Sequence, residues 1–291
     1  MFLGIELRAD SLVTLVVDEA GRVISHAAQK GTDAPAAAAA ARMAIGTHSV
    51  RSGGLVAREA GTEDVRSLAS SVAKSISVQL NDVVTPGAAV ALAEHWCGAA
   101  RGHQNAVVLT AGEGVHAGII VDGRLLTGTH GMAGSAGWLA LNPVEREDYR
   151  RLGCLEAEIG QAGIVRRLVW RIKSGDESRA LEMAGGNLAA ITAQHVFDAA
   201  RQGDGVSISV VRDTAKYIGM AVANLVAIVD PEIVILGGLI ASAGDLLLES
   251  SCTELSRRIR GAADRPNVVP AALGEHGAAI GGARAAMLAA A

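Results

Sequence analysis

The amino-acid sequence predicts an α/β fold made of two similar halves with a cleft between them. Three short strand-like runs open the chain, and a second set of three begins near residue 105. Helical segments follow each set, with further strand-like runs among them. The repeat is one of pattern only, since the two halves share little sequence. With 291 residues, half of them hydrophobic, the chain can form one large domain or two ordinary ones.

Turn-forming stretches and helical spacing define the first half. Three strands are expected at residues 2–7, 12–18 and 23–29, separated by the turns RADS and EAGR. A helix is expected over residues 34–43, because Pro35 suits a first helical turn. Apolar residues recur at helical spacing over residues 63–78 and predict a second helix. The intervening residues 46–62 are interpreted as a loop.

The second half begins as a strand meander and then becomes helical. Strands are expected at residues 105–110, 114–121 and 124–128. Asp122–Gly123 is typical of the hairpin turn between the last two. Beyond Gly153, helical periodicity marks residues 155–172, 187–203, 207–230 and 246–263. A buried strand is expected within residues 231–240, and an Ala-rich helix over 281–291.

Composition argues against several classes of protein. The formal net charge is −4 and the sequence pI is about 6.1, so there is no general attraction to nucleic acid or to an anionic membrane. The three cysteines are few and odd in number, which suits a reduced compartment. No apolar run approaches the ~18–20 residues that span a bilayer, and the N-terminus lacks the pattern of a signal peptide. A soluble, cytoplasmic protein is expected.

Glycines at 112, 114 and 118 follow the apolar run AVVLT and resemble a phosphate-binding loop. Glu113 lies at the centre of this loop, where a carboxylate repels a polyphosphate. In a dinucleotide-binding fold, such a turn leads from a strand into a helix, whereas these glycines lead into another strand. The pattern therefore disfavours a Rossmann site.

Residues 78–139 and 222–250 resemble the ROK family of sugar kinases and sugar-responsive repressors, and a weaker likeness extends over nearly the whole chain. The resemblance implies the actin/hexokinase-like fold, which has two RNase-H-like lobes hinged around sugar and nucleotide. The expected lobes are residues 1–104, with the helix at about 281–291 packed back on them, and residues 105–280. The family also implies a homodimer.

The resemblance assigns a role to Asn81 and Asp82. In the family, an Asn-Asp pair binds sugar hydroxyls, and the Asp is the general base that takes the proton from the attacking hydroxyl. Asp82 is therefore the candidate catalytic residue, and Asn81 a candidate sugar ligand. The alternative role for Asp82 is to cap the helix that follows.

Two phosphate-binding turns depart from the family pattern. Kinases of the family carry an Asp-x-Gly-Gly-Thr type turn after the first strand, where this chain has Glu6 followed by Leu7, Arg8, Ala9 and Asp10. Without glycines the backbone cannot approach a phosphate as closely, and Arg8 is expected to be solvated. The second turn retains Gly112 and Gly114 but has Glu113 in place of the usual Thr. Gly237 and Gly238 match the adenosine-binding turn, although they also suit a strand–helix junction.

The sugar and zinc motifs also depart from the pattern. The family's Gly-Glu-x-Gly-His element is GSAGW here, so Ser135 and Trp138 replace the acid and the histidine. Trp138 either stacks on a sugar ring or fills the core. Of the family's zinc-binding thiols only Cys154 remains, because Glu147 and Tyr149 occupy the other two positions, and one thiol cannot build a structural zinc site. Glu156 matches a sugar-contacting Glu, with an exposed position at a helix start as the alternative.

Three functions are compatible with these departures. The favoured one is a non-catalytic or weakly active protein that binds a sugar or a related small ligand. The second is a working ATP-dependent, glucokinase-like sugar kinase with Asp82 as base, and the third a dimerising scaffold. Magnesium-ATP is expected as a cofactor only if kinase activity persists, and zinc is not expected. Direct DNA binding is not expected either, since no helix-turn-helix precedes the first strand.

Overall fold

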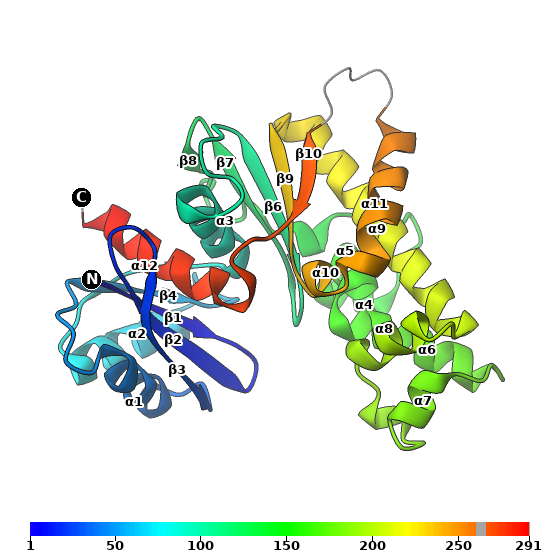
Figure 1. Ribbon diagram of the computed structural model, residues 1–291, viewed down its shortest axis with the longest axis horizontal. Coiled ribbons are helices and arrows are strands. Elements are labelled where there is room, and N and C mark those ends of the chain that lie inside the picture. Colours follow the sequence, from blue (N-terminus) through cyan, green and yellow to red (C-terminus); the bar gives the residue numbers. More distant parts are fainter. Residues whose placement is uncertain (260–265, 291) are drawn as a thin grey trace. The chain divides into compact units, whose positions relative to one another are not determined.

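The structure is a computed structural model that describes residues 1–259 and 266–290, apart from the side chain of Asp82. Within these residues two five-stranded sheets form, with the strand orders β3-β2-β1-β4-β5 and β10-β9-β6-β7-β8 (Figure 1). The chain divides into two compact units. Unit 1 comprises Met1–Val108, His116–Gly134 and Ala271–Ala291, and unit 2 comprises Leu109–Val115 and Ser135–Pro270. The α/β class expected from the sequence is confirmed.

The first sheet is mixed. Its strands are β1 (Phe2–Leu7), β2 (Ser11–Val17), β3 (Val23–Lys30), β4 (Ser52–Val56) and β5 (Leu80–Val84). The first three pair antiparallel, whereas β4 pairs parallel with both β1 and β5. The three opening strands thus lie within one residue of their expected positions.

Three helices of unit 1 cover this sheet, α1 (Ala34–Ile45), α2 (Glu63–Ile76) and α12 (Gly277–Ala289), and a fourth, α3 (Pro86–Cys97), packs on α12. Helices α1 and α2 pack on the face that carries Leu3, Ile5 and Leu55. Helix α12 packs on the opposite face, where Ala279 and Ala283 contact Phe2 and Leu15 (Figure 1). The apolar spacing that predicted α2 and the Pro35 signal that predicted α1 are confirmed.

Strand β4 was wrongly expected to be part of a loop. Glycine has a low strand propensity, so the stretch Ser52–Val56 with its two central glycines carried no strand signal. The fold requires one of them directly, since a Cβ on Gly54 would lie 2.1 Å from the carbonyl oxygen of Gly282 in α12. Similarly, a Cβ on Gly4 of β1 would lie 1.8 Å from the carbonyl oxygen of Ala279. Helix α12 therefore packs backbone against backbone on the sheet.

The second sheet contains β6 (Ala106–Ala111), β7 (Val115–Val121), β8 (Arg124–Leu125), β9 (Ile233–Gly238) and β10 (Asn267–Pro270). Strands β9 and β10 pair parallel, and β7 and β8 pair antiparallel. The buried strand expected within residues 231–240 is confirmed as β9, which is apolar and almost wholly buried. Strand β8 is shorter than expected and ends at Leu125.

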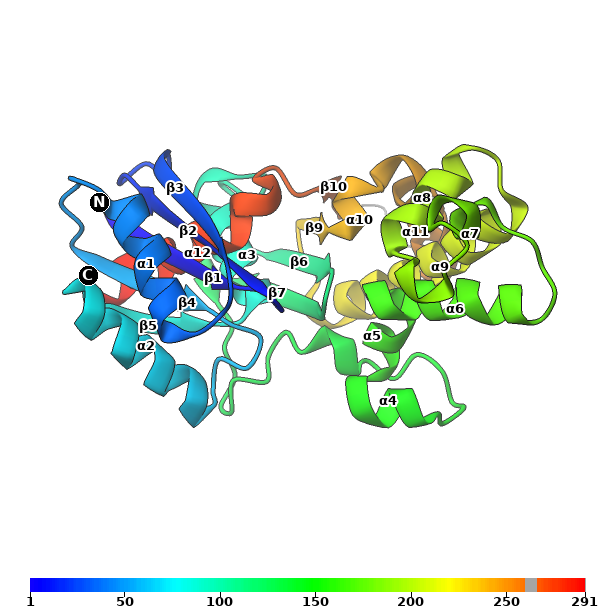
Figure 2. The same ribbon diagram turned by 90° about the horizontal axis from the view of Figure 1, so that it is seen from below.

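The helices of unit 2 are α4 (Glu147–Leu152), α5 (Cys154–Ile159), α6 (Gln161–Lys173), α7 (Arg179–Met183), α8 (Ala193–Arg201), α9 (Gly205–Val229), α10 (Leu239–Ser242) and α11 (Gly244–Arg258). Helix α6 packs beside α5 and α9 (Figure 2). The single helix expected over residues 155–172 is two, because the chain turns at Gly160, whose backbone is extended. The helix expected over 246–263 ends at Arg258, and residues 260–263 lie outside the described part of the chain.

The described helices include none that is long and apolar enough to cross a membrane.

Candidate functional site

The turn between β1 and β2 is closed by protein atoms. The backbone N–H of Arg8 donates to the carbonyl oxygen of Ser11 at 2.9 Å. The guanidinium of Arg8 donates to the Glu6 carboxylate at 2.9 Å and to the carbonyl oxygen of Glu275 at 3.0 Å. The side chains of Arg8 and Glu6 are 30% and 15% exposed. Arg8 is thus a partly buried, paired cation, and the expectation that it is solvated was wrong.

The turn between β6 and β7 contains Gly112, Glu113 and Gly114. The N–H of Gly112 donates to the carbonyl oxygen of Gly114 at 3.0 Å, so this donor points into the turn. The carbonyl oxygen of Gly112 accepts from the N–H of Gln161 at 3.0 Å, which attaches the turn to the start of α6. Glu113 is exposed. This is the geometry of a hydrogen-bonded turn that carries a surface carboxylate.

Glu156 lies in α5 and is 6% exposed. Its Oε2 accepts from the N–H of Val115 at 3.0 Å. Gly137 leaves room for this carboxylate, because a Cβ there would lie 3.2 Å from Glu156 Oε2. Glu156 therefore connects α5 to the start of β7, and the alternative of an exposed Glu at a helix start is wrong.

Trp138 ends the short 3-10 turn Ala136–Trp138 and is 55% exposed. Its indole is therefore not a core filler, and the alternative of a buried position is wrong. Gly153 packs against this turn without a side chain, since a Cβ there would lie 2.3 Å from the carbonyl oxygen of Gly137. Trp138 is left as a large apolar side chain exposed beside the segment that carries Glu156.

Gly237 and Gly238 end β9, and Gly238 lies against the end of β6. Gly238 has a φ of +64°, and a Cβ there would lie 2.2 Å from the carbonyl oxygen of Ala111. Gly238 precedes the four-residue helix α10, so it also forms a strand–helix junction. The structure thus brings Gly238, the turn at residues 112–114 and Glu156 together around the end of β6, all within unit 2.

Asn81 and Asp82 lie within β5 in unit 1. Gly53 pairs with Leu80, but Gly54 pairs with Asp82, so Asn81 is the extra residue of a β-bulge. Its Oδ1 is buried and has no hydrogen-bond partner among the described residues. The side chain of Asp82 lies outside the described part of the chain. The cap of α3 is Thr85, whose Oγ1 accepts from the N–H of Ala88, so the alternative role of Asp82 as a helix cap is wrong.

The segment that aligns with the family's zinc loop forms α4 and an ion-pair cluster. The Tyr149 hydroxyl donates to Glu158 Oε1 at 2.6 Å, and Arg146 donates to the same oxygen at 3.0 Å. Arg146 also lies over the Tyr149 ring at 4.7 Å from its centroid. Burial, followed by the bond to Glu158, raises the pKa of Tyr149. Cys154 is buried and unpaired with any other described cysteine. These residues do not fit a zinc ion, because the tyrosine at a thiol position is committed to a carboxylate.

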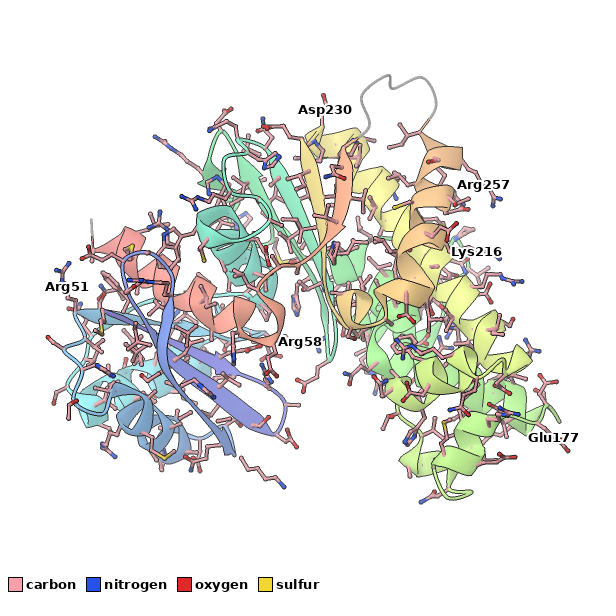
Figure 3. The ribbon with its side chains drawn as sticks, in the orientation of Figure 1. Arg51, Arg58, Glu177, Lys216, Asp230 and Arg257 are labelled. Atoms are coloured by element: carbon pink, nitrogen blue, oxygen red, sulfur yellow. The ribbon has the colours of Figure 1, made fainter. Side chains whose placement is uncertain are left out.

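An arginine-lined pocket in unit 2 was not predicted. It has a volume of about 470 Å³, and its walls include Arg146, Arg166, Arg167 and Arg171. A second pocket of about 430 Å³ shares Arg146 and Arg167 with it and adds Lys216 of α9 (Figure 3). The sequence held one signal, the stretch VRRLVWRIK, in which Arg167 and Arg171 lie four residues apart on one helix face. Helical periodicity alone predicts an amphipathic helix in this stretch and does not indicate a pocket.

Comparison with known proteins identifies the relatives of this chain. A family model described as the ROK family matches residues 67–290. A glucokinase from Halalkalibacterium halodurans is 37% identical over 161 residues, which are 55% of this chain and 48% of that protein. A xylose repressor from Caldicellulosiruptor bescii is 32% identical over 171 residues, 58% of this chain and 42% of that protein. The chain thus spans about half the length of the curated relatives it matches.

The fold has close counterparts among solved structures. A ROK family glucokinase from Streptomyces griseus, solved in complex with glucose and AMPPNP, has a TM-score of 0.85 and 26% identity to this chain. The match covers 99% of both chains. The fold class inferred from the resemblance, a two-sheet hexokinase-like α/β fold, is confirmed. The family model covers most of the sequence, and the chain belongs to the ROK family.

Proposed function

We propose that this ROK-family chain binds a sugar or a related small ligand and transfers phosphate from ATP weakly or not at all. The observation that carries the proposal is the pairing of Arg8 with Glu6 at 2.9 Å in the turn after β1. In kinases of the family, as the sequence resemblance implies, glycines in this turn let the backbone hold phosphates. A phosphate would here have to compete with Glu6 for the one cation of the turn.

The turn at residues 112–114 supports the same proposal. The N–H of Gly112 donates to Gly114 within the turn, which removes one backbone donor from any phosphate. The exposed Glu113 adds a repulsive charge. At an effective dielectric of about 20, two unit charges ~4 Å apart repel by roughly 4 kcal/mol. Magnesium-ATP therefore does not fit these two turns.

The sugar part of the proposal relies on Asn81. Its buried Oδ1 has no partner among the described residues, and leaving a buried acceptor unsatisfied costs about 1–3 kcal/mol. A hydroxyl group of a bound ligand that donates a hydrogen bond to Asn81 Oδ1 would remove this penalty. Asp82, Glu156 and Trp138 remain proposed ligand-contacting residues, and an exposed indole such as Trp138 can stack on the apolar face of a sugar ring.

The alternative is a functional ATP-dependent sugar kinase with Asp82 as general base. The observation that favours it is the likeness to the Streptomyces griseus glucokinase, whose TM-score of 0.85 extends over 99% of both chains. In this alternative Gly112, Gly114, Gly237 and Gly238 would contact the nucleotide.

Calorimetric titration with magnesium-ATP separates the two functions. We expect no binding tighter than about 1 mM, which corresponds to roughly −4 kcal/mol. Tighter binding would favour the kinase, and a screen of glucose, xylose and other sugars for ADP release would follow. Loss of that ADP release in Asp82→Asn would establish the alternative, whereas turnover unaffected by Asp82→Asn would remove Asp82 from the reaction.

The ligand-binding half of the proposal has its own test, the shift of melting temperature by glucose, xylose or N-acetylglucosamine. We expect at least one neutral sugar to raise the melting temperature of the wild-type protein by mass action. Asn81→Ala should abolish that shift without lowering the melting temperature of the ligand-free protein, since it removes an unsatisfied acceptor. Asn224→Ala, at an exposed position of α9, is the matched control and should respond like the wild type. A shift that survives Asn81→Ala would remove Asn81 from the site.

A further inference from the structure

The arginine-lined pocket of unit 2 is a separate feature from the predicted sugar and nucleotide residues. Helix α6 contributes Arg166, Arg167 and Arg171, and the segment before α4 contributes Arg146. The same wall includes one carboxylate, that of Asp213 on α9. The wall itself holds four guanidiniums and one carboxylate, and Asp148, Glu158 and Asp176 behind it form ion pairs with these arginines. The pocket, at about 470 Å³, is large enough for a small organic molecule.

Arg167 is the most buried of these cations, and its hydrogen bonding is incomplete. Its side chain is 15% exposed. Its Nη2 donates to Thr214 Oγ1 at 2.5 Å and to the carbonyl oxygen of Glu158 at 2.8 Å. Its Nε and Nη1 are buried and have no hydrogen-bond partner among the described residues. Buried donors of a charged group are normally satisfied, so these two mark a place for an acceptor.

The acidic residues of the cluster do not supply that acceptor. Glu158 accepts from Tyr149 and Arg146, and its Oε2 lies 3.7 Å from Arg167 Nε, beyond hydrogen-bond distance. Asp148 pairs with Arg146 at 2.5 Å and with Arg166 at 3.3 Å. Burial lowers the pKa of Arg167, and the nearby carboxylates offset this only in part. The guanidinium nevertheless stays charged, as arginine does in proteins.

The wall also has an apolar part. Trp170 of α6 lines the pocket and is 66% exposed, and Val210 of α9 lies in the same wall. A large exposed indole beside several guanidiniums offers a stacking surface next to a charged one. A ligand with a flat or apolar part and an anionic group matches both surfaces.

We propose that this pocket binds a small phosphorylated organic molecule, with its phosphate on Arg166 and Arg167 and its apolar part against Trp170. A phosphate group brings up to two negative charges and three acceptor oxygens, enough for more than one guanidinium. A single carboxylate brings one charge and two oxygens, so it can accept fewer hydrogen bonds from these guanidiniums. The site does not depend on the sugar-binding function proposed above.

Phenyl phosphate and inorganic phosphate are suitable probes, used at a fixed low ionic strength. We expect phenyl phosphate to bind more tightly than inorganic phosphate and to change the tryptophan fluorescence, because its ring lies on the indole. Trp170→Phe should remove that fluorescence change. Equal binding of the two probes would overturn the assignment of an apolar subsite, and no binding of phenyl phosphate at about 1 mM would overturn the site itself.

Arg166→Gln is the main variant, because its side chain is 39% exposed and its loss leaves Arg167 in place. We expect the dissociation constant of phenyl phosphate to rise by about tenfold, as for the loss of one charge-assisted contact. Arg212→Gln is the matched control, since Arg212 is exposed on α9 and does not line the pocket. An equal loss in both variants would mean that only general surface charge attracts the probe.

The same pair of variants keeps this test separate from the kinase test. ATP bound in this pocket would be lost in Arg166→Gln and retained in Arg212→Gln. ATP bound at the turns after β1 and β6 would be retained in both. The nucleotide titration therefore remains interpretable whichever of the two proposals fails.

Discussion

Asp204 links two helices of unit 2 through one carboxylate. It precedes α9 and accepts from the N–H of Ser207 at 2.9 Å and from the hydroxyl of Ser178, at the start of α7, at 2.8 Å. Burial alone would raise the pKa of Asp204, but these hydrogen bonds outweigh it and lower the pKa below its usual value. The charged carboxylate is thus the form that stabilises the fold.

The stability that Asp204 contributes should depend on pH in a defined direction. Because its folded pKa lies below the unfolded value of about 3.9, the contribution is complete above that value and is lost as the pH falls through the folded pKa. Asp204→Ala should lower the free energy of unfolding by about 1 kcal/mol at pH 7. Urea denaturation at pH 7, 5 and 3 measures this, and the difference from wild type should shrink at the lowest pH.

Asp64→Ala is the control for this measurement. Asp64 is exposed in the first turn of α2, and the N-cap residue of that helix is Thr62. Asp64→Ala should change the free energy of unfolding by less than about 0.5 kcal/mol. A loss in Asp204→Ala that stays constant down to pH 3 would exclude the charged cap as its cause.

Tyr149 illustrates what the sequence could and could not predict at a single residue. The absence of thiols at residues 147 and 149 indicated that the zinc site of the family was not retained. What replaced it depends on Arg146, Glu158 and Arg166, which come from three segments of unit 2. No spacing rule connects these residues, because their contact arises only when α4 and α6 pack against α5. The ion-pair cluster was therefore not predictable from the sequence.

Helix α12 is an element whose position depends on the absence of side chains. A Cβ on Gly281 would lie 1.8 Å from the carbonyl oxygen of Ala89 in α3, and the clash is with backbone that cannot rotate away. Gly281→Ala should therefore lower the free energy of unfolding by about 3 kcal/mol or more. The gain in helix propensity, about 1 kcal/mol, is too small to offset this.

Denaturation of Gly281→Ala beside Gly61→Ala measures this effect. A Cβ on Gly61 meets no atom within 4 Å, and the residue lies in the loop before α2. Its replacement should be neutral or slightly stabilising. If Gly281→Ala were as stable as Gly61→Ala, the close approach of α12 and α3 would be contradicted.

The same packing explains which elements the sequence predicted. Strands and helices with a clear apolar period, such as β1 and α2, were predictable because their pattern is local. Strand β4 was not, because its glycine Gly54 is required by α12, more than 200 residues later in the chain. A long-range backbone contact leaves no local hydrophobic pattern.

At the scale of the whole molecule, we expect the fold to be independent of zinc. The described residues contain no group of three or more His, Cys, Asp or Glu side chains arranged to hold a metal ion. Metal analysis of the purified protein should give far less than one zinc per chain, and a chelator should leave the melting temperature unchanged, unlike proteins whose folding is coupled to a structural metal. Stoichiometric zinc, or a fall in melting temperature with the chelator, would refute this.

The fold of the molecule was more predictable than its site. The order of strands and helices follows from local periodicity, and the family follows from two long segments that resemble ROK proteins. The candidate site depends on single side chains at turns, such as Arg8 and Glu113, whose hydrogen bonds require the folded chain. The arginine-lined pocket combines α6, α9 and the segment before α4, so its shape could not be inferred from any one of them.

The position of α12 in the chain has a consequence for biosynthesis. One face of the first sheet, with Phe2 and Leu15, is covered by Ala279 and Ala283. The ribosome makes that sheet before unit 2, and α12 only afterwards. Nascent unit 1 therefore emerges with an apolar surface that its own covering helix cannot yet reach. Unit 2 can therefore complete its core before unit 1 does.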